Sequence, residues 1–268
     1  MEPVAGSQPT SSRPDIPTSS LAKGIEVLLA LVDRGSARVE DLAEQVGIPV
    51  STVYRYVRTM RIYGLLEGED GQYVLGPRLA RFSVRRSAPH LVELARPILG
   101  RLVAETGETA ILTVRVGLAA MCLDRIESPH PVRLSYELGS AWPLHAGASA
   151  KALLAYAPEE VQRRVLAGPV TRFTSRTPDA VRLRHQLAEI RATGVVVTRG
   201  EVDPAATGIA LPLRRGDVAV CAVSVAGPSS RLTTARTDAV VSELRAGVRE
   251  LEALVDDAPS AWPGVARP

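Results

Sequence analysis

Apolar residues in the first quarter of the chain recur every three or four positions, in three short segments. This spacing puts them on one face of a helix, so each segment predicts an amphipathic helix. The positions are Leu21, Ile25, Leu28 and Leu29, then Val39, Leu42, Ala43 and Val46, then Val53, Val57 and Met60. Gly47 suits the left-handed end of the second helix, and Pro49 suits the start of the third. The pattern therefore predicts a leading helix followed by a helix–turn–helix pair.

A short β-hairpin is predicted directly after these helices. Leu65–Glu67 and Gln72–Leu75 read as two strands, and the glycines and acids of residues 68–71 read as the turn between them. A hairpin in this place is a wing. Residues 20–76 are therefore predicted to form a winged helix-turn-helix domain.

The third helix is predicted to present a basic face that is free of acids. No Asp or Glu occurs in residues 45–66, while Arg55, Arg58 and Arg61 recur every third residue. A helix–turn–helix unit with such a face presents side chains to a DNA major groove. The alternative is a pair of helices that merely pack together. The wing, the leading helix and the acid-free face together favour DNA binding.

A basic segment, residues 77–88, follows the wing and is predicted to form a linker helix. It contains no acidic residue, and its Arg78 and Arg85 are expected to hold DNA phosphates. Residues 1–19 are rich in Pro, Ser and Thr and are expected to be a disordered tail, and residues 258–268 a second tail.

The remaining residues, 89–257, show groups of strand-like runs between helical ones. Helices are expected at 89–106, with a bend or restart at Pro97, and at 147–157, 178–193 and 235–256. Strands are expected at Thr109–Val116, Ala119–Ile126, Val132–Leu138, Val195–Thr198, Ile209–Leu213 and Val218–Val225. This order predicts an α+β domain with an antiparallel sheet.

Composition narrows the class of protein. The chain has 268 residues, 46% of them apolar and 23% charged, which is typical of a globular protein with room for two domains. Its net charge is only +3, so the DNA-binding hypothesis depends on where the arginines lie. There is no secretory signal and no apolar run long enough for a bilayer, so we expect a cytoplasmic protein without membrane contact. Cys122 and Cys221 are expected to be reduced core residues.

Enzyme motifs are nearly absent from the sequence. There is no P-loop, no dinucleotide fingerprint and no nucleophile elbow, and the four histidines lack metal-ligand spacing. We therefore expect no enzymatic activity, no cofactor and no metal.

The strongest candidate for a small-molecule site is residues 142–151, WPLHAGASAK. The small residues from Gly147 to Ala150 open a predicted helix, where free N–H groups favour an anion such as a carboxylate. The alternative is that they only permit close packing of the helix on a sheet. His145 is expected to be a turn or packing residue, since no acid and nucleophile flank it at a telling spacing.

Several segments in order resemble the IclR family of bacterial transcriptional regulators. They are LAKGIEVLLAL, VEDLAEQVGIPVSTVYRYVRTMRIYGLL, YVLGPRLARF, PLHAGASAKALLA, GEVDPAATGIALPL and AVSVAGP, and they extend from about Ser20 to Asp256. The resemblance implies a winged helix-turn-helix, a linker helix and an effector domain with a GAF/PAS-like sheet. It also implies homodimers or dimers of dimers that bind small, frequently acidic metabolites.

The resemblance also assigns roles to individual positions. The family's contacts to phosphates and bases fall on Ser51, Thr52, Tyr54, Arg55 and Arg58. Its ligand contacts fall on Ala148, Ser149, Thr198, Gly208 and Ser224, with Leu134 as an apolar wall.

Two positions depart from the family pattern. Thr198-Arg199 stands where relatives often have Ser-Asp, and Ala226 stands where a Ser is frequent. An inward Arg199 would bind an acid, and an outward Arg199 would be only a solvated strand-end residue. The outward orientation is favoured because arginines are seldom buried unpaired.

These observations predict a DNA-binding regulator whose operator binding is modulated by a small organic acid. The expected partners are a palindromic double-stranded DNA operator and a second copy of the chain. One alternative is an enzyme-like C-terminal domain carried by a DNA-binding adaptor. Another is a DNA-binding oligomer without a ligand.

Overall fold

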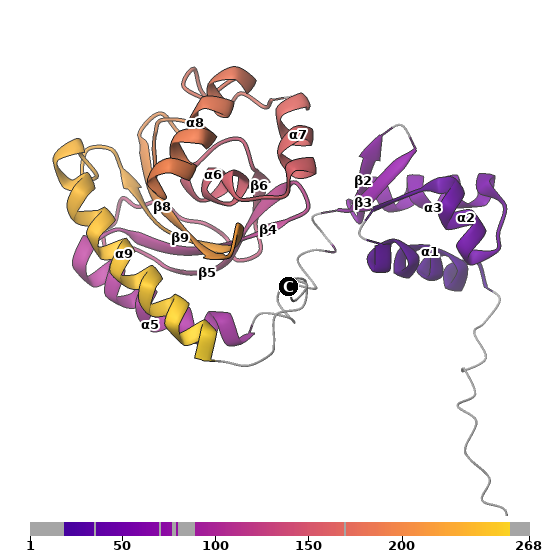
Figure 1. The fold of residues 1–268 in the computed structure, drawn as a ribbon, viewed down its shortest axis with the longest axis horizontal. Coiled ribbons are helices and arrows are strands. Elements are labelled where there is room, and N and C mark those ends of the chain that lie inside the picture. Colours follow the sequence, from indigo (N-terminus) through magenta and orange to yellow (C-terminus); the bar gives the residue numbers. More distant parts are fainter. Residues whose placement is uncertain are drawn as a thin grey trace, which may run out of the picture. The chain divides into compact units, whose positions relative to one another are not determined.

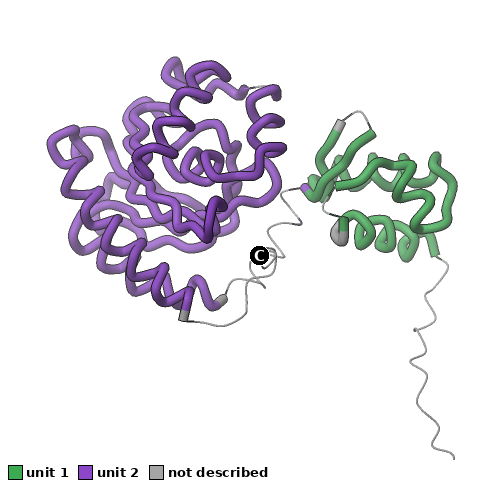
Figure 2. The backbone as a smooth tube through the Cα atoms, viewed as in Figure 1, with its two compact units in different colours: residues 1–75 green, residues 76–268 purple. Residues whose placement is uncertain are grey.

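The computed structural model describes residues 19–34, 36–69, 71–76, 79, 89–168 and 170–257. The chain divides into two compact units, residues 1–75 and 76–268, which Figure 2 shows in different colours. Apart from Ser19 and Leu79, the predicted tails and the linker helix lie outside the described residues. Arg78 and Arg85 lie outside them too, and the finer domain bounds remain predictions.

The first unit is a winged helix-turn-helix. Its elements are α1 (Ser20–Arg34), β1 (Ser36–Arg38), α2 (Val39–Val46), α3 (Val50–Ile62), β2 (Leu66–Glu69) and β3 (Gln72–Leu75). The helix α2 ends at Gly47, whose φ of 69° lets its N–H reach the Ala43 carbonyl. The strands form an antiparallel sheet in the order β1-β3-β2. The strand β1 was not predicted from the sequence, because it is three residues long and only its middle residue, Ala37, is buried.

Apolar residues of all three helices form one core, but the predicted stripe of α1 is wrong. Leu21, Ile25 and Leu29 are exposed, and α1 packs through Val27, Ala30 and Leu31 instead. Val27 and Leu31 of α1, Leu42 of α2, and Val53 and Val57 of α3 are all essentially inaccessible to solvent. Leu66 and Tyr73 of the hairpin close this core from the wing side. The second and third helices are therefore held in place by the buried faces that the sequence predicted.

The second unit is built on a six-stranded antiparallel sheet in the order β6-β5-β4-β9-β8-β7. Its strands are β4 (Thr109–Val116), β5 (Ala119–Ile126), β6 (Ala141–Pro143), β7 (Val196–Arg199), β8 (Ala206–Arg215) and β9 (Val218–Pro228). The central pair is β4 and β9, in which Ile111 lies opposite Ser224 and Thr113 opposite Ala222. The predicted antiparallel α+β fold is confirmed.

Helices cover both faces of this sheet, as Figure 1 shows. One face carries α5 (Pro89–Thr106) and α9 (Thr234–Asp257), and its core includes Leu99, Leu112, Val223 and Leu244. The other face carries α6 (Ala148–Ala155), with α7 (Glu159–Ala167) and α8 (Ala180–Thr193) packed around it. Alternate residues of each strand serve the two cores, so strand alternation decides which side chains meet α6.

The predicted strand at Val132–Leu138 is wrong. This segment is irregular, and side chains hold it in place of a sheet ladder. The Thr109 hydroxyl donates to the Leu134 carbonyl over 2.9 Å, and the Arg125 guanidinium donates to the Tyr136 carbonyl. Prolines at 129 and 131 come just before it and supply no N–H for a ladder. The expected restart at Pro97 is also absent, because α5 is one helix through that residue.

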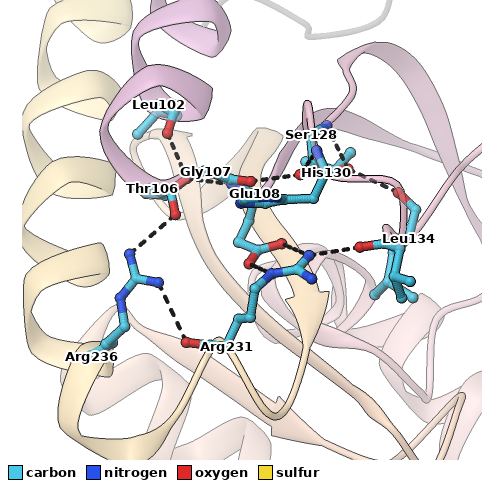
Figure 3. A network of polar contacts seen from close by, with 11 residues as sticks. Leu102, Thr106, Gly107, Glu108, Ser128, His130, Leu134, Arg231 and Arg236 are labelled. Carbon is cyan, nitrogen blue, oxygen red and sulfur yellow. Dashed lines mark hydrogen bonds and ion pairs between the residues drawn. The ribbon is translucent and has the colours of Figure 1, made fainter.

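A network of polar contacts around the buried carboxylate of Glu108 holds the beginning of the same segment (Figure 3). The Arg231 guanidinium binds both carboxylate oxygens of Glu108, over 2.5 and 2.8 Å, and also the Val132 carbonyl over 2.8 Å. The Ser128 hydroxyl donates to the Gly107 carbonyl over 2.6 Å. The start of β4, the turn before α9 and residues 128–134 are thereby tied together.

Candidate DNA and ligand sites

The exposed face of α3 gathers the predicted DNA-binding residues of this helix. Ser51, Tyr54, Arg55, Arg58 and Arg61 are exposed, whereas Val53 and Val57 of the same helix are buried in the core. Spacings of three and four place these exposed residues on one side. Thr52 is half-buried beside them. Within the described residues the Arg58 side chain has no hydrogen bond or ion pair, so its five donors remain available to a ligand.

Two aromatic rings and one acid modify this face. The Arg55 guanidinium carbon lies 5.5 Å from the centre of the Tyr56 ring. The Tyr54 hydroxyl lies 3.5 Å from the carboxylate of Glu40, on α2, and the negative charge of Glu40 raises the pKa of Tyr54. The segment 45–66 is free of acids, but the fold brings Glu40 next to it. Sequence analysis missed this acid because it lies on the preceding helix.

The first turn of α6 brings together most of the predicted ligand residues. The hydroxyls of Ser149 and Ser224 are 2.8 Å apart, and both side chains are buried. A Cβ on Gly208 would lie 3.2 Å from the Ala148 Cβ and 3.3 Å from the Thr198 hydroxyl. Gly208 therefore lets α6 approach the sheet closely, in line with the packing alternative. It also places Ala148 and Thr198 beside each other.

Leu134 lies in an adjoining apolar cluster. The cluster contains Ile111, Cys122 and Ala226 of the sheet, with Leu134, Tyr136 and Trp142 packed against them. Ile111 lies opposite Ser224 in the sheet, so the cluster borders the serine pair. Leu134 is thus placed to form an apolar wall beside Ser149 and Ser224.

The N-terminal end of α6 already faces one acid of the chain. The Gly147 N–H donates to one carboxylate oxygen of Glu201 over 3.3 Å. The other oxygen accepts from the Lys151 ammonium over 2.6 Å, and Lys151 also donates to Gln186 over 3.1 Å. The next N–H groups, of Ala148, Ser149 and Ala150, donate no hydrogen bond within the described residues, as expected at a helix start.

The pair formed by Lys151 and Glu201 is buried, with only 2% and 7% of the side chains exposed. Burial lowers the pKa of the Lys151 ammonium, and the charge of Glu201 opposes this shift. Sequence analysis missed this pair. Both residues stand in segments that it quoted, but the lysine and the acid are fifty positions apart in the chain.

Arg199 points away from the ligand residues. It donates to the Leu232 carbonyl over 2.8 Å and to the Thr237 hydroxyl over 2.7 Å, on the face of the sheet that carries α9. The expected orientation away from the ligand is correct, but the expectation of a merely solvated residue is wrong. Arg199 ties β7 to the turn before α9 and to the first turn of that helix.

A hollow of about 980 Å³ lies at the other end of α6. It is lined by Tyr156, Gln162, Arg184, Arg191 and Arg214, among others, and by none of the predicted ligand residues. Arg191 is already engaged with the Ala155 carbonyl, and Arg214 lies 4.8 Å from the centre of the Tyr156 ring. We place the candidate ligand site at the N-terminal end of α6 because its free N–H groups and buried hydroxyls point to a specific ligand.

The remaining candidate residues have packing roles. His145 is 2.9 Å from the Thr171 carbonyl and stacks on Phe173. Cys122 and Cys221 are both free and buried, and burial raises their pKa values to about 11 and about 12. The described part of the chain contains no group of side chains suited to a metal ion and no helix able to cross a membrane.

Comparison with known proteins finds relatives of both units. The family model for the IclR helix-turn-helix domain matches residues 20–70, and that for the bacterial transcriptional regulator IclR C-terminal domain matches residues 86–253. The HTH-type transcriptional regulator BhcR of Paracoccus denitrificans is 32% identical over 240 residues, covering 87% of this chain and 85% of that protein. The transcriptional repressor IclR of Escherichia coli is 31% identical over 239 residues, covering 81% and 82%.

A solved structure shares the fold of both units. It is a crystal structure of an IclR homolog from Microbacterium hydrocarbonoxydans complexed with 4-hydroxybenzoate. The two chains are 31% identical, with a TM-score of 0.62, and the match covers 90% of this chain and 100% of the other.

Proposed function

The chain belongs to the IclR family of bacterial transcriptional regulators, and we propose that a small organic acid bound at the start of α6 modulates its binding to DNA. The observation that carries this proposal is the group of free N–H donors next to the buried Ser149–Ser224 pair. Such donors favour a carboxylate. Its named relatives are transcriptional regulators and not enzymes, and the chain is likewise a DNA-binding regulator.

The chemistry around the helix start supports an acid with an apolar body. Leu134 and Trp142 lie in the apolar cluster that borders the serine pair, and they can cover a ring or a short chain. Glu201 would repel an acid if it were alone, but Lys151 neutralises it at 2.6 Å. The homolog that binds 4-hydroxybenzoate, an aromatic acid, supports the same class of ligand.

A thermal-shift screen of small acids tests this site. We expect an acid to raise the melting temperature of the wild type and to have no effect on Ser149→Leu, whose side chain fills the site. Ser149→Ala removes the hydroxyl without adding volume and should bind the acid more weakly. Ser230→Leu, at an exposed serine, is the matched control and should respond like the wild type. The site is wrongly placed if no acid stabilises the wild type, or if one stabilises Ser149→Leu equally.

For DNA, we propose that the exposed face of α3 enters the major groove and that phosphates are held around it. The proposed contacts are Ser51, Thr52, Tyr54, Arg55, Arg58 and Arg61, with Arg78 and Arg85 of the linker on phosphates. Arg55→Ala should cost roughly 1–3 kcal/mol of binding free energy and relax sequence preference if it reads a base. Arg245→Ala, which removes an exposed charge from α9, is the control and should bind normally. Equal gel-shift affinities for Arg55→Ala and the wild type would contradict the assignment.

We also propose that the chain acts as a homodimer, or a dimer of dimers, on a palindromic operator. The supporting observation is an apolar stripe on α1 that its own unit leaves uncovered: Leu21, Ile25 and Leu29 are 74%, 47% and 55% exposed. Light scattering at micromolar concentration should give at least twice the chain mass of 28.5 kDa. A monomer would refute the proposal.

A further inference from the structure

One buried hydroxyl in the second unit lacks a hydrogen-bond partner among the residues that the structure describes. The Thr113 side chain lies in β4 and is 0% exposed, and its Oγ1 makes no hydrogen bond within the described residues. A buried polar group without a partner costs free energy, and native proteins contain few of them. One explanation for such a group is that a ligand atom forms the missing hydrogen bond when the ligand is bound.

The position of Thr113 in the sheet places this hydroxyl on the ligand side. Strand alternation puts Thr113 on the same face as Ile111, which belongs to the apolar cluster of Leu134 and Trp142. Its neighbours across the sheet are Cys122 of β5 and Ala222 of β9. The Cys122 thiol faces the Asp124 carbonyl, and an alanine offers no polar side-chain atom, so these neighbours supply no good partner.

The distance to the serine pair suits a small molecule. Ser224 lies opposite Ile111 and is therefore the diagonal neighbour of Thr113, at roughly 7–8 Å in an antiparallel sheet. Ser149, bonded to Ser224, marks the first turn of α6, where the N–H groups are free. A one-ring or short-chain acid whose carboxylate meets these N–H groups can extend along the sheet towards Thr113.

We propose that Thr113 is a specificity-determining residue, whose hydroxyl bonds a second oxygen of the effector, remote from the carboxylate. The effector is then a hydroxy or keto acid and not a purely hydrocarbon acid. This inference rests on the proposed acid site at α6. It adds the residue that distinguishes acids differing by one oxygen.

The substitution Thr113→Val separates this role from a structural one. Valine has the same shape but lacks the hydroxyl, so it removes the unpaired buried group and should leave the ligand-free protein as stable as the wild type, or more stable. Thr109→Val is the matched control. Thr109 is also 0% exposed and on the same face of β4, but its hydroxyl donates to the Leu134 carbonyl and accepts from the Ser128 N–H. Thr109→Val should melt below the wild type.

The binding experiment uses the full chain and two pairs of acids, in each of which one member carries an additional oxygen remote from the carboxylate: 4-hydroxybenzoate with benzoate, and 4-oxopentanoate with pentanoate. Calorimetric titration should show that the wild type prefers the oxygen-bearing member of at least one pair by roughly threefold to tenfold, the worth of one hydrogen bond. Thr113→Val should lose that preference while still binding the other member.

Each other outcome overturns a defined part of the account. The inference alone is overturned if Thr113→Val keeps the preference for the oxygen-bearing acid. It is also overturned if Thr113→Val melts as far below the wild type as Thr109→Val does. In both cases the proposed acid site still stands. A wild type that binds these acids without preferring the oxygen-bearing member also overturns the inference alone. A wild type that binds none of the four acids overturns the proposed acid site and this inference together.

Discussion

Replacing Glu201 with glutamine is expected to destabilise the second unit strongly. The Glu201 carboxylate is the only acid within the described residues that forms an ion pair with Lys151, whose side chain is 2% exposed. The glutamine side chain in Glu201→Gln keeps an oxygen that can accept from the Gly147 N–H, so the main loss is the negative charge. Lys151 would then be a buried ammonium held only by Gln186.

The magnitude follows from the burial of the pair. Removing one partner of a buried ion pair costs about 3–5 kcal/mol, because the remaining charge is left without compensation. For a unit of this size, each kcal/mol lowers the melting temperature by roughly 2–4 °C. Glu201→Gln should therefore melt roughly 6–20 °C below the wild type at pH 7. The double variant Lys151→Met with Glu201→Gln removes both charges and should recover most of this loss.

The stability that Glu201→Gln loses relative to the wild type should become smaller as the pH rises. Burial lowers the pKa of Lys151 below its ordinary value of 10.5, and Glu201 opposes the shift. Without Glu201 the folded-state pKa falls further, while the unfolded pKa stays at its ordinary value. Between these two values the unfolded chain binds more protons, so the stability of Glu201→Gln rises with pH relative to the wild type.

Denaturant unfolding at pH 7 and pH 9.5 measures both effects. Glu160→Gln is the matched control, since the ion pair of Glu160 with Arg163 is well exposed and should be worth less than about 1 kcal/mol. A Glu201→Gln variant within 1 kcal/mol of its control at pH 7 would refute the reasoning. So would a loss that grows at pH 9.5.

Three further predictions concern two glycines and one arginine. Gly227→Ala would place a Cβ 2.3 Å from a carboxylate oxygen of Glu108, so it should disrupt the bond to Arg231 and cost roughly 3–5 kcal/mol in chemical denaturation. Gly100→Ala, in α5, would place its Cβ 3.6 Å from the nearest atom, on Ile126, so it should instead stabilise by about 0.5–1 kcal/mol; a loss of stability would show that this contact is too tight. Arg58→Ala should weaken DNA binding in gel shifts and leave the melting temperature unchanged, and a fall in that temperature would show a structural role.

Most of the first unit could be predicted from the sequence because its signals are local. The buried face of α1 was the exception, because apolar residues lie on both sides of this helix and the exposed stripe of Leu21, Ile25 and Leu29 has the same helical spacing as a core face. Helical spacing of apolar residues identified the buried face of α3, and therefore also its exposed arginines. Gly47 and Pro49 marked the turn between α2 and α3. The short strand β1 was missed because three residues with one buried side chain carry too little periodicity to be recognised.

In the second unit, the sequence identified the elements better than the contacts between them. The segment 132–138 has the apolar content of a strand, but Thr109 and Arg125 hold its carbonyls from other elements. The pairing of Lys151 with Glu201 depends on the loop after β7 returning to α6. The unpaired hydroxyl of Thr113 becomes visible only when the register of β4, β5 and β9 is known. Each of these depends on long-range packing, which periodicity does not encode.

Gel-shift titration with and without a bound acid tests the central claim most directly. The full chain would first select a DNA fragment from a random pool, and its affinity for that fragment would be measured with and without the acid that raises its melting temperature most. We predict that the acid changes the wild-type affinity by at least about fivefold, while Ser149→Leu binds the same DNA without responding. A chain that selects no sequence, or whose DNA affinity is unchanged by an acid that it binds, would contradict the account.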